Sequence, residues 1–286
     1  MDEKVFLNDK LVPAPQAKLS VFDAGFLHGA ALFETMRAYA GKVYRLDQHL
    51  ERLVRSAKVL SIPLTVDEDF LRHAVEQTLQ ANGLSEARLR LTLSRGDLRR
   101  SPDHTQAATL VITASAMTPY SAEFYQKGMT VVLSDVKLNS SDPLARHKSS
   151  NYLSRLLVLG KAQQLGAGEA LWFTELNQLG EGCICNVFLA KDSTLLTPPL
   201  EEPILPGITR AAVLELAQAD KIPTHQQRLT IDDLLGAEEI FLTNSIMEVM
   251  PVCRFEKHAV GNERPGPLTQ RLAELYRQDV AEKCGV

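Results

Sequence analysis

Residues 87–93 constrain the fold most, because their side chains alternate strictly between two chemical classes. The stretch reads ARLRLTL, so arginine and threonine alternate with leucine. In an extended strand this alternation places the leucines on one face and the polar side chains on the other. We therefore predict a half-buried strand. Two amphipathic helices are expected just before it, at residues 47–60 with Asp47 as N-cap and at residues 67–81.

The remaining periodicities predict an α+β fold. Further strands are expected at residues 5–7, 11–12, 19–22, 34–39, 43–46, 109–115, 129–136, 170–174, 187–190, 194–197 and 239–243. Further helices are expected from a lysine-containing loop to about residue 165 and at residues 207–219, 231–235 and 268–280, with turns at residues 175–182. Strands outnumber helices and antiparallel connections are common, which favours α+β over a doubly wound sheet. Proline-containing residues 117–121 are interpreted as a linker between domains at residues 1–116 and 122–286.

Composition excludes several classes of protein. The 286 residues carry a net charge of −4, which gives no indication of a nucleic-acid partner. The charged N-terminus has no apolar core of a signal peptide, and no apolar run reaches the length of a membrane helix. Four scattered cysteines without a CxxC pair fit reduced thiols, so a cytoplasmic location is expected. The histidines fall at no zinc-ligand spacing, so no metal site is proposed.

Lys148 is the strongest candidate for a chemical role. It lies after a polar loop and before leucines at helical spacing. A lysine held where an element begins can point into a cavity, where burial or a nearby cation lowers the pKa of its amine for carbonyl chemistry. An exposed lysine before a helix is the alternative.

Other polar groups could hold an anionic, heterocyclic cofactor. Gly207, Ile208 and Thr209 open a helix after a proline, which leaves N–H groups for an anion. Glu181, between two glycines, could pair with a protonated ring nitrogen, as a pyridoxal cofactor requires. Further anion contacts could come from Arg52, Thr243, Asn244 and Ser245. For each of these groups the alternative is a structural role without a ligand, as a helix cap, a turn residue or a solvated side chain.

The arginines of the alternating strand suggest a carboxylate substrate. Arg88 and Arg90 share one strand face, where like charges repel unless an anion joins them. Arg99 and Arg100 follow in the next loop, and Arg37 lies in another strand. The alternative is an edge strand protected from aggregation by its charges.

Several segments together resemble class IV aminotransferases, the fold-type IV pyridoxal-phosphate enzymes. They are VFDAGFLHGAALFETMRAY, YRLDQHLERLVRSA, HKSSNYL, GEGCICNVF, LTPPLEEPILPGITR and LTNSIMEVMPV. The resemblance implies a small α/β domain and a larger pseudo-barrel domain with pyridoxal 5′-phosphate between them, in a homodimer. It implies that Lys148 links to the cofactor and moves a proton, that Glu181 pairs with the ring nitrogen, and that Leu205 packs on the ring. The residues implied to hold the phosphate are Arg52, Ile208, Thr209, Asn244 and Ser245.

Within that family the sequence is most similar to aminodeoxychorismate lyases, which release pyruvate to form p-aminobenzoate for folate synthesis. The arginine-bearing strand, the KxxN spacing after Lys148 and the TNSIMEV loop carry this likeness. The lyase substrate has two carboxylates, and the residues expected to bind substrate are Phe33, Arg37, Arg90 and Arg100. The first alternative is an aminotransferase for branched-chain or D-amino acids. Phe33 replaces the tyrosine of the D-specific enzymes, and Pro102 replaces the histidine of their carboxylate trap. The second alternative is a protein that only binds the cofactor or acts as a scaffold.

Overall fold

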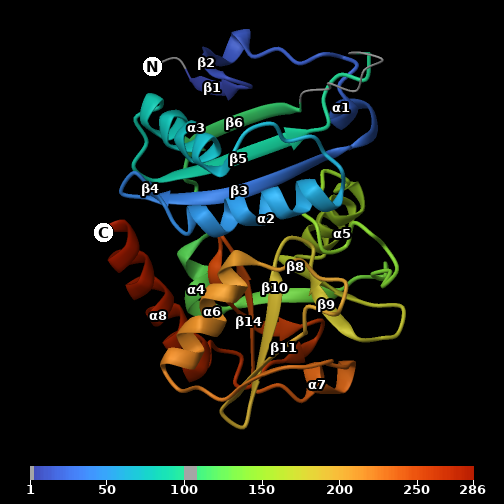
Figure 1. The fold of residues 1–286 in the computed structure, drawn as a ribbon. Helices are drawn as coiled ribbons and strands as arrows, with labels where there is room; N and C mark the ends of the chain where they lie inside the picture. Colours follow the sequence, from blue (N-terminus) through green and yellow to red (C-terminus); the bar gives the residue numbers. More distant parts are fainter. Residues whose placement is uncertain (1–2, 100–107) are drawn as a thin grey trace. The chain divides into compact units, whose positions relative to one another are not determined.

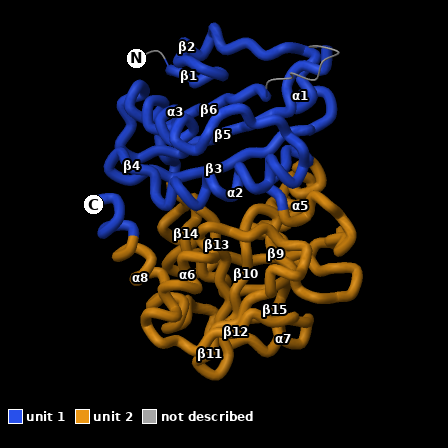
Figure 2. The backbone as a smooth tube through the Cα atoms, in the orientation of Figure 1, with its two compact units in different colours: residues 1–118, 147–151, 280–286 blue, residues 119–146, 152–279 orange. Residues whose placement is uncertain are grey.

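The computed structural model describes residues 3–99 and 108–286, and the chain divides into two compact units (Figures 1 and 2). Unit 1 contains the chain as far as Thr118, together with His147–Asn151 and Val280–Val286. Unit 2 contains Pro119–Arg146 and Tyr152–Asp279. The domain boundaries drawn from sequence assign both short segments to the second domain. Spacing along the chain cannot reveal this arrangement, because the segment around Lys148 is attached to unit 1 by backbone hydrogen bonds to residues 31–33, which are distant in sequence.

Unit 1 is built on a six-stranded antiparallel sheet with the order β2-β1-β6-β5-β3-β4. The strands are β1 (Lys4–Leu7), β2 (Lys10–Pro13), β3 (Ala31–Tyr39), β4 (Lys42–Val43), β5 (Ala87–Ser94) and β6 (Thr109–Ala116). The helical elements are η1 (Ala14–Gln16), α1 (Ala24–His28), α2 (Leu46–Val59) and α3 (Glu68–Ala81). The predicted strand at residues 87–93 is confirmed as the central β5, which pairs with β3 and β6.

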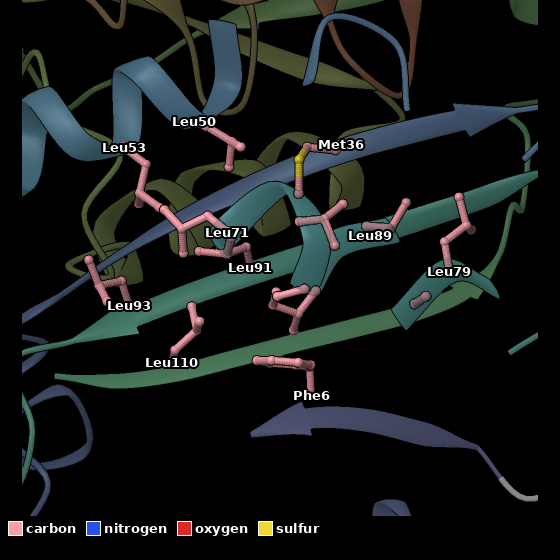
Figure 3. Packing of buried hydrophobic residues seen from close by; sticks show 14 of the residues in the cluster. Phe6, Met36, Leu50, Leu53, Leu71, Leu79, Leu89, Leu91, Leu93 and Leu110 are labelled. Atoms are coloured by element: carbon pink, nitrogen blue, oxygen red, sulfur yellow. The ribbon is translucent and has the colours of Figure 1, made fainter. Parts of the chain in front are cut away.

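The leucine face of β5 forms the centre of the unit 1 core. Leu89, Leu91 and Leu93 are buried, and side chains of α2 and α3 cover them (Figure 3). The other labelled members of the cluster are Phe6, Met36, Leu50, Leu53, Leu71, Leu79 and Leu110. Burial of this apolar surface is what orders the strands, at about 25 cal/mol per Å² removed from water. The polar face of β3 and β5 is thereby left for other contacts.

Unit 2 contains a curled nine-stranded mixed sheet with the order β12-β11-β10-β13-β14-β7-β8-β9, and β15 pairs with β14. The strands are β7 (Met129–Leu133), β8 (Glu169–Phe173), β9 (Leu179–Gly182), β10 (Asn186–Lys191), β11 (Thr194–Thr197), β12 (Thr224–Gln226), β13 (Glu239–Asn244), β14 (Glu248–Phe255) and β15 (His258–Ala259). The helices are α4 (Ala122–Lys127), α5 (Leu153–Gln164), α6 (Ile208–Ala219), α7 (Ile231–Leu235) and α8 (Pro267–Cys284). The end strand β9 returns to β10 through a tight loop in which Gly182 N–H donates to the Cys185 carbonyl at 2.7 Å. The predicted α+β class is confirmed.

Three predicted strands are wrong or too long. Residues 19–22 form a turn instead of a strand, with Asp23 N–H donating to the Ser20 carbonyl at 3.1 Å. The strand expected at 43–46 ends at Val43, because α2 begins at Leu46. The strand expected at 129–136 ends at Leu133, where the Ser134 hydroxyl bonds the backbone of Val136 and turns the chain.

Two further predictions are corrected by local backbone geometry. Asp47 is not the N-cap of α2, because the helix begins one residue earlier and its cap position is Arg45 in a left-handed conformation. Residues 175–182 are not all turn, because Leu179–Gly182 forms β9. Its sequence LGEG has neither β-branched nor aromatic side chains, so no strand signal was available. By contrast, Asp67 caps α3 by accepting from Phe70 N–H at 2.9 Å.

Two further structural details concern the helices and the cysteines. Among residues 3–99 and 108–286, no helix combines the length and the apolar character needed to cross a bilayer. The four cysteines, all in the described part of the chain, are buried thiols without a disulfide bond.

We predict that Leu91→Ala destabilises the fold by about 2–5 kcal/mol, the usual cost of truncating a fully buried leucine. Leu91 is completely buried between two helices and the sheet. The measurement is urea unfolding followed by circular dichroism. Val59→Ala, at an exposed position at the end of α2, is the matched control. Equal losses for the two variants would contradict this account of the core.

Candidate active site

The loop that carries Lys148 is fixed to the start of β3 by main-chain hydrogen bonds. Phe33 N–H donates to the Lys148 carbonyl at 2.9 Å, and Ser150 N–H donates to the Ala31 carbonyl at 2.8 Å. Leu32 and Ser149 form an isolated antiparallel bridge between these bonds. The lysine is therefore part of the sheet edge of unit 1, held before α5 begins.

The side chains of Lys148 and Arg90 both contact the aromatic ring of Phe33. Its Nζ lies 4.4 Å from the centroid of the Phe33 ring, and the Arg90 guanidinium carbon lies 3.9 Å from the same centroid. Arg90 also donates from Nε to the Thr92 hydroxyl at 3.3 Å. Cation–π contacts of this kind hold the amine and the guanidinium close together on the polar face of the sheet.

Arg37 lies further along the same face of β3. Its guanidinium covers the Tyr39 ring at 4.4 Å, and its Nη2 lies 3.8 Å from a carboxylate oxygen of Glu86. Arg37 is directly opposite Arg88 in the register of β3 and β5. The structure thus brings Arg37, Arg90 and Phe33, three of the predicted substrate-binding residues, onto one face, while Arg100 lies outside the described residues.

The opposite face of β3 carries a buried charge cluster. Glu34 accepts from Arg52 at Nε (2.8 Å) and at Nη2 (2.5 Å), and its Oε2 lies 2.7 Å from His49 Nδ1. Burial alone would raise the pKa of Glu34, but the charge of Arg52 and the hydrogen bonds from His49 and Arg52 outweigh it and bring that pKa to about 2. Burial also lowers the pKa of His49, so its imidazole stays neutral near pH 7. One edge of the Arg52 guanidinium is therefore already engaged by a carboxylate.

In unit 2, Glu181 is held by donors on both carboxylate oxygens. Arg155 Nη2 donates to Oε1 at 2.6 Å, and the Leu205 N–H donates to Oε2 at 2.9 Å. Asn186 Nδ2 also donates to Oε2 at 3.2 Å. The Glu181 side chain is 3% exposed, so these donors offset the cost of burying its charge. Glu181 and Leu205, singled out separately in the sequence, are thus in direct contact.

The N-terminus of α6 presents backbone donors without a side-chain cap. Gly207 occupies the cap position, and within the described chain no side chain accepts from the first turn. Thr209, in that turn, is buried. A Cβ on Gly207 would collide with the Asn186 amide, so only glycine allows this close approach. A partly buried, uncapped helix start favours binding of an anion.

Asn244 and Ser245 lie at the turn that follows β13. The Asn244 side chain accepts from the N–H groups of Ile246 and Met247, both at 2.8 Å, and donates to the Ile184 carbonyl at 3.1 Å. The Asn244 side chain therefore shapes the turn. A ligand here could be contacted by the backbone of the turn and by Ser245. Next to them, the buried Thr243 hydroxyl has no hydrogen-bond partner in the described part of the chain.

Comparison with known proteins identifies the family. The family model of amino-transferase class IV matches residues 31–255. A putative branched-chain-amino-acid aminotransferase of Methanocaldococcus jannaschii is 35% identical over 99% of this chain and 98% of that protein. The aminodeoxychorismate lyase of Bacillus subtilis is 31% identical over 96% and 94%. The chain belongs to the class IV aminotransferases.

The likeness extends to the three-dimensional structure. A branched-chain aminotransferase of Thermoproteus uzoniensis, solved with norvaline, superimposes with a TM-score of 0.90 at 29% identity, covering 99% of this chain and 96% of that one. The predicted fold-type IV architecture is confirmed. Class IV aminotransferases use pyridoxal 5′-phosphate, so this member of the family is a pyridoxal-phosphate-dependent enzyme.

The polar groups described above fit that cofactor. Pyridoxal phosphate has an anionic phosphate, an aldehyde and a ring nitrogen that can be protonated. The uncapped start of α6 and the Thr243 hydroxyl that lacks a partner among the described residues suit the phosphate. The Glu181 carboxylate suits the ring nitrogen, and the Lys148 amine suits the aldehyde.

Sequence reasoning missed the polar groups that support these residues. Glu34 and His49 were not recognised, although Glu34 occupies an inward position in a strand, beside Met36. A charged residue at a core position indicates a buried ion pair and could have been noticed. Asn186 and Arg155 gave no such signal. Within residues 3–99 and 108–286, no group of three acidic, histidine or cysteine side chains could hold a metal ion.

We predict that Glu34→Gln lowers the free energy of unfolding by about 3–5 kcal/mol at pH 7, because Arg52 keeps a buried charge without its partner. The measurement is urea unfolding, and Glu123→Gln, on the exposed surface of α4, is the control. A loss no larger than that of the control would contradict the importance of the buried pair.

The same cluster predicts how stability depends on pH. Glu34 has a lowered pKa of about 2, so its stabilisation is complete above 4.5 and is lost as the pH falls towards 2. His49 is neutral when folded, so stability already begins to fall below its ordinary pKa of 6.5, where the unfolded imidazole takes up a proton. Unfolding free energies measured between pH 7 and pH 3 should therefore decrease continuously. A flat profile in the wild type would contradict the assignment.

Proposed function

We propose that the chain is an amino-acid aminotransferase, which transfers an amino group from an amino acid to a 2-oxo acid. The observation that carries this proposal is the placement of Lys148 and Arg90 on one Phe33 ring. An amine that can move a proton then lies beside a guanidinium that can bind a substrate carboxylate. Family membership supports the proposal independently.

We propose the following roles for the cofactor-binding residues. Bound pyridoxal phosphate supplies an aldehyde that links to amines and a ring that withdraws electrons from the substrate Cα. Lys148 would hold the cofactor through its aldehyde, and its amine, when free, would move the proton at the substrate Cα. Glu181 accepts a hydrogen bond from the protonated ring nitrogen, and Leu205 packs on the ring. The phosphate is assigned to Arg52, Ile208, Thr209, Asn244 and Ser245.

We assign substrate recognition to the polar face of β3 and β5. Arg90 is the carboxylate partner nearest to the lysine, because both lie against Phe33. Arg37, paired loosely with Glu86 at 3.8 Å, is a second candidate. Arg100 remains a candidate from sequence alone.

We favour transamination over the lyase reaction, because the M. jannaschii relative, named a putative branched-chain aminotransferase, is 35% identical over almost the whole chain. This reverses the order favoured by the sequence motifs. The lyase remains the second candidate, with its proposed place in folate synthesis. Arginines 37, 88 and 90 on neighbouring strands support it, since two carboxylates would balance them, as does the 31% identity to a named lyase.

The two reactions are separated by their need for an amino acceptor. The holoenzyme is given leucine, other L-amino acids or D-alanine with 2-oxoglutarate, and glutamate is measured. In parallel it is given aminodeoxychorismate without any oxo acid, and pyruvate is measured. Glutamate formation without pyruvate release supports transamination. Stoichiometric pyruvate release would instead establish the lyase.

Lys148→Ala is predicted to lower amino transfer by about 10²–10⁴-fold or more, because the base that moves the Cα proton is lost. Glutamate formation is the measurement, and added methylamine should restore part of the rate by replacing the missing amine. Lys161→Ala, at an exposed position on α5, is the matched control. Full activity of Lys148→Ala would overturn the assignment.

We also propose a homodimer. In unit 2, Leu153, Leu156 and Leu157 on α5 are 70%, 53% and 59% exposed, and they lie at helical spacing. In unit 1, Phe26 and Leu27 of α1 are also exposed. Exposed apolar side chains at helical spacing, as on α5, commonly mark protein interfaces, and a second copy of the chain is the partner that the family resemblance implies.

The homodimer is tested by the double substitution Leu156→Glu with Leu157→Glu. We expect the wild type to have the mass of a dimer in light scattering and the variant to have the mass of a monomer, because buried carboxylates would oppose association. Leu235→Glu, exposed on α7, is the control. A monomeric wild type would contradict the proposal.

A further inference from the structure

Arg155 and Glu181 form an ion pair whose arginine no family motif singled out. Arg155 lies on α5 and Glu181 on β9, both labelled in Figure 1. Arg155 Nη2 donates to Glu181 Oε1 at 2.6 Å, and the two side chains are 18% and 3% exposed. Arg155 Nη1 donates to the carbonyls of Gly182 and Cys183, both at 3.1 Å. The guanidinium is thus anchored to the backbone that follows the carboxylate.

The described hydrogen-bond partners of Glu181 are all donors. Besides Arg155, only donors contact the carboxylate in the described chain: the Leu205 N–H and the Asn186 amide, both on Oε2. A protonated carboxyl group would need an acceptor for its own hydrogen, and none of these three groups offers one there. A carboxylate surrounded by donors is therefore the species that the site is built to hold.

Among the other titratable groups near Glu181, the buried Glu169 carboxyl accepts from the Cys183 N–H at 2.9 Å, and burial raises its pKa. Burial raises the pKa of Tyr152 and the pKa of Cys185, so both remain neutral at physiological pH. Burial lowers the pKa of Arg210 to about 10, so it remains a cation. Arg155 is the cation in hydrogen-bond contact with the carboxylate, and its pKa is raised: burial opposes this, but the charge of Glu181 outweighs it. The charge balance at Glu181 thus depends chiefly on Arg155.

We infer that Arg155 is a positioning residue that keeps Glu181 ionised, so that the proton shared between Glu181 and the cofactor's ring nitrogen stays on the nitrogen. This inference rests on the proposed pairing of Glu181 with that nitrogen. In a buried site, a carboxylate and a protonated ring can neutralise each other by moving the proton to the carboxylate, because low polarity disfavours separated charges. With Arg155 in place, that transfer would leave a buried guanidinium without its partner, which makes the transfer unfavourable.

The location of this proton matters for the proposed reaction. A protonated ring nitrogen withdraws electrons from the substrate Cα much more strongly than a neutral one. Arg155 would therefore act on the reaction through Glu181, without touching the substrate or the cofactor. A purely structural arginine, holding only the carbonyls of Gly182 and Cys183, would leave the protonation of the ring unchanged.

The test reads the protonation of the ring nitrogen directly. The protein is loaded with pyridoxal phosphate labelled with ¹⁵N in the ring, and the ¹⁵N chemical shift is followed by NMR across pH 6–9. Three proteins are compared with the wild type: Arg155→Met, which removes the charge, Arg155→Lys, which keeps it, and Arg277→Met, an exposed control on α8.

We expect the wild-type ring to stay protonated over the whole range. In Arg155→Met the signal should move towards the unprotonated value at every pH in this range, because the proton then passes from the ring nitrogen to the Glu181 carboxylate. Arg155→Lys and Arg277→Met should behave like the wild type. An unchanged signal in Arg155→Met with the cofactor bound would overturn the inference and leave Arg155 as a structural clamp, with the proposed function intact.

The wild-type titration tests the inference even where Arg155→Met does not fold. Loss of the ring proton near neutral pH in the wild type would overturn it, because Arg155 would then not keep the ring nitrogen protonated. A wild-type protein that binds no cofactor at Lys148 would overturn the proposed function together with this inference. The two failures are thus distinguishable.

Discussion

The chemistry proposed for this chain depends on the antiparallel bridge between the Lys148 loop and the start of β3. Hydrogen bonds on either side of the Leu32–Ser149 bridge make this loop an extension of the sheet, although more than a hundred residues separate the two segments. The sheet itself is ordered by the apolar face of β5, which is buried under α2 and α3. Core burial on one face thus fixes the lysine on the other, so that its amine lies against Phe33.

Both units use a buried carboxylate held by an arginine from a helix. In unit 1, Arg52 of α2 binds Glu34 of β3, and in unit 2, Arg155 of α5 binds Glu181 of β9. A buried carboxylate is costly unless it is paired and hydrogen-bonded, so each pair also fixes the orientation of its strand and helix. The pairs differ in purpose: Glu34 stabilises the element that carries Arg52, whereas Glu181 presents its charge to the cofactor in the function we propose.

The sequence predicts elements well where the side-chain periodicity is strong. The strand expected at residues 87–93 and the helix expected at residues 67–81 are both found. Sequence-based prediction fails where one hydrogen bond or one backbone conformation decides where an element begins or ends. At Arg45, a left-handed conformation starts α2 before Asp47. For the site, motifs singled out Lys148 and Glu181 as candidates, but Arg155 has no pattern of its own, because its proposed role arises from a contact with a residue 26 positions away. Such contacts depend on the fold and are not encoded in local spacing.

The central claim is that Lys148 is the residue that links to the cofactor. It is tested most directly by loading the protein with pyridoxal phosphate, reducing the link with borohydride and mapping the modified peptide by mass spectrometry. The account predicts a single stable pyridoxyl group on Lys148. A pyridoxyl group on any other lysine, or a protein that carries none after reduction, would contradict it.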